Sequence, residues 1–168
     1  MVKIKYYTAY ISSRSGNNDS MWRQKYYLQA IQKYIPELEI YYGHYLTHQI
    51  TAKVVNPPPD SIKVYQTEEK GSDVNLALHI LNDAWLNEYD CAVAVSNDGD
   101  LAESLRLVKS QNNKTIGLIF PNTNSKRKPS RELSRYANFI KHIRTNVLSK
   151  SLLPENISGT GIYKPKEW

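Results

Sequence analysis

The sequence is poor in cysteine, and its single cysteine, Cys91, stands inside an apolar run. One cysteine cannot form an intramolecular disulfide, so a disulfide-stapled extracellular scaffold is excluded and a reducing compartment fits. We expect Cys91 to be a small core residue rather than a reactive thiol, because free cysteine is among the most buried residue types.

Long hydrophobic segments are also lacking. No stretch approaches the roughly 20 apolar residues that span a bilayer. The N-terminal sequence Met-Val-Lys-Ile-Lys-Tyr-Tyr has no apolar signal-peptide core. We therefore expect a cytoplasmic protein with no membrane partner. Its 168 residues suffice for one domain with a substantial core.

Histidine-based sites are the third feature that the sequence lacks. The four histidines show no metal-ligand spacing, and no Ser/His/Asp or Cys/His arrangement emerges. Phenylalanine is scarce as well, with 2 residues against 13 tyrosines. Tyrosines can line a core with one wet end or stack on nucleobases, and composition does not choose between these roles.

Charge, by contrast, is abundant and unevenly distributed. Residues 60–103 hold ten acidic and two basic side chains, whereas residues 126–144 hold seven basic and one acidic. Residues 1–34 add six basic side chains and one acidic, and the whole chain carries a net charge of +6. An acidic centre between basic segments suits a metal site beside a polyanion track. An unevenly charged, solvated surface is the alternative.

The hydrophobic pattern predicts alternating strands and helices. Strands are expected at 3–11, 38–46, 62–67, 91–96, 116–120 and 139–143, and helices at 20–34, 72–88, 101–111 and from 130 onward. Residues 47–60 are expected to form a loop or hairpin, because the run Pro57-Pro58-Pro59 cannot join a sheet interior. The alternation predicts an α/β layered fold with a largely parallel sheet.

The segment 91–96 is almost continuously apolar, which is typical of a parallel strand buried on both faces. It ends in Asp98 and Asp100, and Asp73 begins the helix that follows the preceding strand. In a parallel sheet both positions lie at the carboxyl edge, where such folds build their sites. Carboxylates that converge repel each other unless a cation or proton intervenes.

Mg²⁺ and Mn²⁺ prefer oxygen ligands and can activate water for phosphodiester cleavage. Each acid also has a purely structural alternative. Asp100 with Glu103 matches a helix capping box, Asp73 could complement a helix dipole, and Asp98 could be a turn residue.

Two stretches resemble the NYN domain family, the PIN-like nucleases of the LabA-like group. They are residues 68–77, Glu-Glu-Lys-Gly-Ser-Asp-Val-Asn-Leu-Ala, and residues 89–101, Tyr-Asp-Cys-Ala-Val-Ala-Val-Ser-Asn-Asp-Gly-Asp-Leu. The closing segment 162–168 also resembles the end of a bacterial branch of this family. The resemblance implies a PIN-like three-layer α/β/α sandwich with a mostly parallel central sheet, and Mg²⁺- or Mn²⁺-dependent cleavage of RNA.

The resemblance also implies roles for individual residues. Asp73, Asp98 and Asp100 match the acidic residues that serve as the catalytic and metal-binding set. Ser96 and Asn97 would shape the turn that presents these acids. Lys70 would orient the carboxylates or contact phosphate, and a surface ion pair with a neighbouring glutamate fits Lys70 equally well.

The chain departs from the family pattern at its beginning. The family opens with a central strand that ends in an aspartate, and the first acid of this chain is Asp19, in a polar loop. We therefore expect a shortened NYN/PIN-like domain over residues 1–150 whose first strand is missing, with an irregular tail over 151–168 packed on it. A longer parent protein, a partner chain or second copy that completes the sheet, and an inactive relative all remain open.

Basic side chains supply candidate RNA contacts. Lys126, Arg127, Lys128 and Arg131 could grip an RNA backbone without reading its sequence, and Arg14 is a weaker candidate. The bland alternative is a solubilising loop. The leading hypothesis is a metal-dependent endoribonuclease that hydrolyses RNA phosphodiester bonds. A catalytically inactive RNA- or protein-binding module, or one part of a split or oligomeric nuclease, is the alternative.

Overall fold

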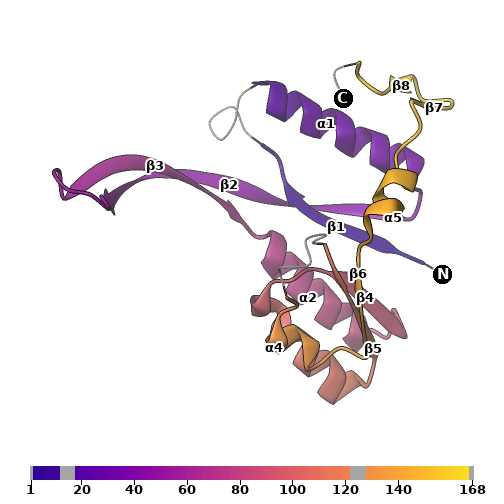
Figure 1. Ribbon diagram of the computed structural model, residues 1–168. Coiled ribbons are helices and arrows are strands. Elements are labelled where there is room, and N and C mark those ends of the chain that lie inside the picture. Colours follow the sequence, from indigo (N-terminus) through magenta and orange to yellow (C-terminus); the bar gives the residue numbers. More distant parts are fainter. Residues whose placement is uncertain (1, 12–17, 122–127, 167–168) are drawn as a thin grey trace. The chain divides into compact units, whose positions relative to one another are not determined.

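The computed structural model describes residues 2–11, 18–121 and 128–166 (Figure 1). The chain divides into two compact units. Unit 1 comprises residues 1–72 and 154–168, and unit 2 comprises residues 73–153. The expected domain over residues 1–150 stays a prediction. Each unit is described by itself below.

Unit 1 is built on two parallel strands joined by a helix. Strand β1 (Ile4–Ala9) pairs in parallel with the start of β2 (Leu38–Lys53), and helix α1 (Asn18–Tyr34) connects them. The helix buries Leu28 and Ile31, as expected for an apolar stripe that faces a sheet. The Gln24 side chain bonds the strand end, donating to the Ala9 carbonyl at 2.8 Å and accepting from the Ile11 amide at 2.8 Å.

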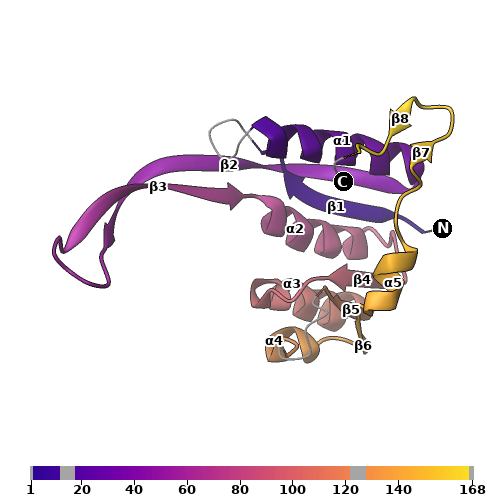
Figure 2. The same cartoon turned by 45° about the horizontal axis from the view of Figure 1, so that its top comes forward.

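Strand β2 continues far beyond its pairing with β1, which ends at Gly43. From His44 to Lys53 it pairs only with the antiparallel strand β3 (Ser61–Lys70). We call these residues, 44–53 and 61–70, the ribbon; Figures 1 and 2 show it as a long, curved pair of strands. Of the loop or hairpin expected over residues 47–60, the hairpin is confirmed: residues 47–53 are its first strand, and the proline run lies in its turn.

Gly43 marks the point where the ribbon begins. A β-carbon on this glycine would lie 2.3 Å from the backbone carbonyl oxygen of Lys70. Because that neighbour is backbone, a larger residue could be accommodated only by moving a strand. The absence of a side chain at Gly43 thus permits the close approach of β2 and β3.

Unit 2 holds a three-stranded parallel sheet in the order β4-β5-β6. Its elements in chain order are α2 (Ser72–Trp85), β4 (Cys91–Val95), the 3₁₀ turn η1 (Gly99–Leu101), α3 (Ala102–Leu107), the π-helical turn η2 (Val108–Asn112), β5 (Thr115–Phe120), α4 (Arg131–Ser134), β6 (Phe139–His142) and α5 (Thr145–Lys150). Helix α2 ends three residues before the expected Glu88, close to Asn87, whose φ of 59° is left-handed and incompatible with a continuing helix.

The core of unit 2 lies around the middle strand. Strand β5 buries Ile116, Leu118 and Phe120, and Leu105 and Leu133 pack into the same cluster from the helices. Each of these five side chains is at most 2% exposed. The middle strand is thus the buried strand of this sheet.

Strand β4 is not buried on both faces, and this expectation is wrong. It forms the edge of its sheet, and only Ala94 is fully buried, whereas Val93 and Val95 are 48% and 53% exposed. Cys91 is also exposed, which corrects its assignment to the core. An uninterrupted apolar run specifies only a strand, and its neighbours in space decide how many faces are covered.

The C-terminal tail is more regular than expected. Two short antiparallel strands, β7 (Asn156–Ile157) and β8 (Ile162–Tyr163), form a small hairpin in unit 1. The hairpin lies beside α1, and the Tyr163 amide donates to the Tyr26 hydroxyl at 3.1 Å. Residues 156–157 and 162–163 are thus regular, and the packing of the whole tail on a domain over residues 1–150 stays a prediction.

The fold is mixed α/β, as the sequence predicts. Parallel pairing is present between β1 and β2, β4 and β5, and β5 and β6, so the expected parallel sheet is present in part. A single central sheet and a missing first strand stay predictions. Among the described residues, no helix combines the length and apolarity needed to cross a membrane.

Candidate functional site

The residues at the end of β4 form a tight turn, residues 98–100, that we call the acidic turn. The Ser96 hydroxyl accepts a hydrogen bond from the Asp98 amide at 3.1 Å, and Asp98 Oδ1 accepts one from the Asp100 amide at 3.1 Å. Asp98 therefore caps η1, which corrects the alternative that Asp100 is the cap. Both aspartates remain exposed, so their carboxylates are open to solvent.

Glu103 does not complete a capping box either. Its carboxylate binds the Arg106 guanidinium at 2.6 and 2.7 Å, one helical turn away. The guanidinium lowers the pKa of Glu103, chiefly through this hydrogen bond. Glu103 thus belongs to an ion pair on the helix surface.

The structure does not gather the three predicted aspartates into a metal cluster. Asp73 lies exposed in the first turn of α2, whereas Asp98 and Asp100 share the acidic turn. Across the described ranges, no three His, Cys, Asp or Glu side chains are grouped so that they could hold a metal ion. The pair in the acidic turn is brought together, and a metal site that includes Asp73 stays a prediction.

A further acid, Glu132 of α4, lies against the acidic turn. A β-carbon placed on Gly99 would come within 2.7 Å of Glu132 Oε2, so the carboxylate covers this glycine. Sequence reasoning did not single out Glu132. The available signal was its isolation, since it is the one acid among seven basic residues in 126–144.

Asn97 connects the acidic turn to a segment more than thirty positions along the chain. Its Oδ1 accepts from the Ser130 amide at 2.7 Å, and its Nδ2 donates to the Lys128 carbonyl at 3.4 Å. We call residues 128–131, Lys-Pro-Ser-Arg, the basic segment. The side chains of Lys128 and Arg131 are exposed there.

Three of the predicted RNA contacts, Arg14, Lys126 and Arg127, lie outside the residues that the structure describes.

Lys70 forms an ion pair with Glu68 at 2.5 Å, which confirms the ion-pair alternative for this residue. The hydrogen bond from Lys70, followed by its charge, lowers the pKa of Glu68.

Tyr89 fastens the residues that precede β4 to helix α2. Its hydroxyl donates to the Ile80 carbonyl at 2.6 Å. Burial raises the pKa of Tyr89 to about 12, with smaller contributions from Asp83 and Cys91. Because the neutral hydroxyl is retained, this contact helps to fix the strand that carries the acidic turn.

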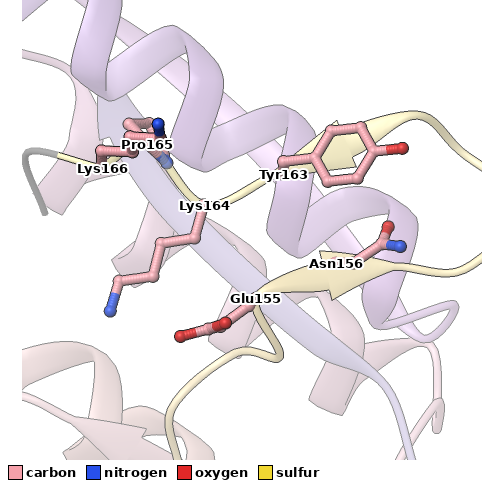
Figure 3. A pocket seen from close by; sticks show the side chains of 6 residues that line it. All are labelled: Glu155, Asn156, Tyr163, Lys164, Pro165 and Lys166. Carbon is pink, nitrogen blue, oxygen red and sulfur yellow. The ribbon is translucent and has the colours of Figure 1, made fainter.

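Unit 1 has a hollow of about 380 Å³ on its C-terminal hairpin (Figure 3). It is lined by Glu155, Asn156, Tyr163, Lys164, Pro165 and Lys166. None of the predicted site residues that the structure describes lines this hollow.

Two known proteins are similar to this chain over most of its length. It is 33% identical over 177 aligned residues to 6-hydroxy-3-succinoylpyridine 3-monooxygenase HspA of Pseudomonas putida (strain DSM 28022 / S16). That alignment covers 98% of this chain and 57% of HspA, so the chain spans little more than half the length of this relative. The crystal structure of a protein of unknown function from Vibrio parahaemolyticus RIMD 2210633 matches with a TM-score of 0.52.

The Vibrio protein is 16% identical in sequence, and the match covers 86% of this chain and 70% of that one. Identity at this level supports the fold alone. The sequence model of the NYN domain, in contrast, matches residues 2–148, which include the acidic turn and the basic segment. The chain belongs to the NYN domain family.

Proposed function

We propose that the chain is a metal-dependent endoribonuclease of the NYN type, which hydrolyses RNA phosphodiester bonds. The observation that carries this proposal is the acidic turn at the carboxyl end of β4, tied through Asn97 to the basic segment. Carboxylates suit a divalent ion, and exposed cations suit a phosphate backbone. Membership of the NYN family supports the same combination.

The residues of the acidic turn suit Mg²⁺ or Mn²⁺. Asp98 and Asp100 are exposed oxygen ligands, and Mg²⁺ is commonly held by one or two carboxylates together with waters and substrate phosphates. Asp73 is the proposed third acid. A bound ion would supply an activated water and would stabilise the leaving oxygen.

The protein's own contribution is to hold the acids and the substrate in place. Ser96 and Asp98 accept the backbone amides of the turn, which fixes the Asp98 carboxylate and the backbone that carries Asp100. Lys128 and Arg131 are proposed to contact RNA phosphates, which positions the strand without reading its sequence. Hydrolysis then adds water across one phosphorus–oxygen bond, with hydroxide going to phosphorus and the proton to the leaving oxygen.

The decisive variant is Asp98→Asn. An asparagine keeps the Oδ1 that accepts the Asp100 amide, so the cap is retained while the negative charge is lost. We expect Mn²⁺- or Mg²⁺-dependent cleavage of a labelled single-stranded RNA to fall by about 100-fold or more, the scale on which one preorganised electrostatic group acts. Circular dichroism should show an unchanged fold.

Asp90→Asn is the matched control, because Asp90 is an exposed acid immediately before the opposite end of β4. This variant should cleave as the wild type does. Equal cleavage in EDTA, or full activity of Asp98→Asn, would show that the metal mechanism is wrong. RNA binding without cleavage would favour the inactive binding module.

A second candidate activity comes from HspA, which is named as a monooxygenase of 6-hydroxy-3-succinoylpyridine. A monooxygenase inserts one oxygen atom of O₂ into its substrate and reduces the other to water, so it needs a reductant. Incubation with this pyridine, O₂ and NADH, followed by mass spectrometry, tests this activity. Because carbon 3 carries the succinoyl group and no hydrogen, oxygen placed there either forms an ester one oxygen atom heavier or displaces that side chain to leave a dihydroxypyridine. Either product would replace the nuclease proposal.

A further inference from the structure

We propose that Asn97 is a positioning residue that holds the basic segment against the acidic turn, so that the RNA affinity of Lys128 depends on the Asn97 amide. This inference rests on the proposed function, because it assigns the basic segment to RNA. It differs from a role in shaping the turn, which the family resemblance implies for Asn97.

The hydrogen bonds within the turn are made without Asn97. The Asp98 amide is accepted by the Ser96 hydroxyl, and the Asp100 amide is accepted by Asp98 itself. Both hydrogen bonds recorded for the Asn97 side chain go to the basic segment instead. The side-chain amide of Asn97 therefore connects parts of the chain that are distant in sequence.

The two bonds enclose Pro129. The Lys128 carbonyl precedes this proline and the Ser130 amide follows it, and Asn97 binds both. The bond from the Ser130 amide, at 2.7 Å, is short for an N–H donor, whereas the bond to Lys128, at 3.4 Å, is long and weak. Since proline fixes its own φ, holding both flanking peptide groups fixes the local path of the segment.

The far end of the segment is anchored in the core. Ser130 is the N-cap of α4, and its hydroxyl accepts from the Leu133 amide at 3.5 Å. The Leu133 side chain is fully buried, and Glu132 between them lies against Gly99. Asn97 and Leu133 thus hold the two ends of a short stretch on which Lys128 and Arg131 are exposed.

Holding the backbone of this segment in advance matters for RNA binding. A lysine on a loose segment must be ordered when it meets a phosphate, and where that entropy cost exceeds the gain from the contact, the phosphate contact is not made. When Asn97 binds the basic segment, the backbone of this segment is already ordered in the free protein. Loss of the Asn97 amide should therefore weaken binding in the same way as loss of the Lys128 charge.

The test is a double-mutant cycle with Asn97→Ala and Lys128→Ala. The probe is a fluorescently labelled oligouridylate, and affinity is measured by anisotropy in EDTA, so that cleavage plays no part. We expect each single variant to bind about 5- to 10-fold more weakly, and the double variant to bind no more weakly than either. A plot of log affinity against log salt has a negative slope, and each variant should make this slope shallower by about 0.7. That is the value for one phosphate contact to a single strand.

The matched control is Asn82→Ala, which removes an exposed asparagine from α2 and should leave affinity and salt slope unchanged. Losses that add in the double variant would overturn the proposal, because Asn97 would then act independently of Lys128. So would an unchanged salt slope in Asn97→Ala, since a merely structural defect does not remove a phosphate contact.

Hydrogen exchange of the Ser130 amide provides a second readout. The amide should be protected in the wild type and in Asn97→Asp, which keeps the acceptor oxygen, and unprotected in Asn97→Ala. A rapidly exchanging Ser130 amide in the wild type would overturn the proposal even if Asn97→Ala fails to fold.

The experiments distinguish failure of the nuclease proposal from failure of the positioning role of Asn97. If Asp98→Asn still cleaves RNA, the metal mechanism falls while the coupling of Asn97 to Lys128 can stand. If Asp98→Asn is inactive and the losses in the cycle add, only the positioning role falls. Absence of RNA binding by the wild type overturns both.

Discussion

Asn97 and Asp98 are neighbours in the sequence, but their side chains bind backbone groups at very different separations along the chain. Asp98 accepts the amide two residues ahead, whereas Asn97 binds peptide groups 31 and 33 residues away. The first contact can be predicted from sequence, because short polar side chains before a helical turn commonly cap it. The second cannot, because it depends on where β5 and α4 carry the chain.

Glu132 illustrates the same limit. Its position two residues after Ser130 predicts the first turn of a helix, where an acidic residue complements the dipole. Its contact with Gly99 follows only from the placement of α4 on η1. The candidate site therefore contains a carboxylate that no local pattern assigns to it.

Tyr89 provides a pH prediction at the scale of a single residue. Burial raises its pKa from 10.0 to about 12, so the neutral hydroxyl is favoured in the folded chain. Its contribution to stability is complete below about pH 10 and is lost as the pH rises towards 12. We expect Tyr89→Phe to lower the free energy of unfolding at pH 7 by about 1 kcal/mol, through the lost hydrogen bond to Ile80.

Urea unfolding at pH 7 and at steps above pH 10 measures both effects. The difference in stability between wild type and Tyr89→Phe should shrink as the pH rises through this window. Tyr65→Phe serves as the control, because this side chain is 76% exposed. A difference that stays constant with pH would contradict the assignment.

Among the elements, the ribbon departs most from the sequence prediction. Its strands carry Ile50 opposite Val64 and Ala52 opposite Ile62, and the hydroxyls of Thr47 and Thr67 lie 2.9 Å apart. Such cross-strand contacts stabilise a sheet pair by a few tenths of a kcal/mol each. For residues 47–60 the sequence leaves both a loop and a hairpin open, because only the pairing partner decides whether this polar alternation becomes a strand.

A two-stranded segment is marginally stable without further cover. Residues 38–43 of β2 pair with β1, whereas the ribbon strands pair only with each other. We expect the hydrogen-bonded amides of the ribbon to exchange at least about tenfold faster than those of β2 that pair with β1. Hydrogen exchange followed by mass spectrometry or NMR measures this ratio. Equal protection would indicate that something covers the ribbon in solution.

Strand β4 is predictable as a strand but not in its surroundings. Its apolar sequence is that of a buried strand, yet Val93 and Val95 are about half exposed at the edge of the sheet. Strand β5 has a similar composition, and its side chains are buried because Leu105 and Leu133 pack into the same cluster. Composition fixes the preference for extended backbone, and the elements that pack on each face fix the burial.

At the scale of the whole molecule, charge gives the most general expectation. The net charge is +6, and the basic residues gather in 1–34 and 126–144. If these segments bind RNA, counterions are released and affinity falls with salt. A fourfold rise in salt should weaken binding by about 2.5-fold for each phosphate contacted, given a slope near −0.7 per contact.

Anisotropy titrations of the same oligouridylate at several salt concentrations measure this slope. The pair of substitutions Lys128→Ala and Arg131→Ala should make it shallower by about 1.4, if both side chains contact phosphate. An affinity that does not change with salt would exclude a phosphate track and leave the solubilising role for these residues.

The sequence by itself determined the family, the order of most strands and helices, and the acidic turn that closes β4. These features depend on periodicity and on contacts between residues a few positions apart. The tertiary structure alone decided that Asn97 binds the basic segment, that Glu132 covers Gly99 and that β4 lies at a sheet edge. Each of these depends on which strands become neighbours, and that is settled by packing over the whole unit rather than by local spacing.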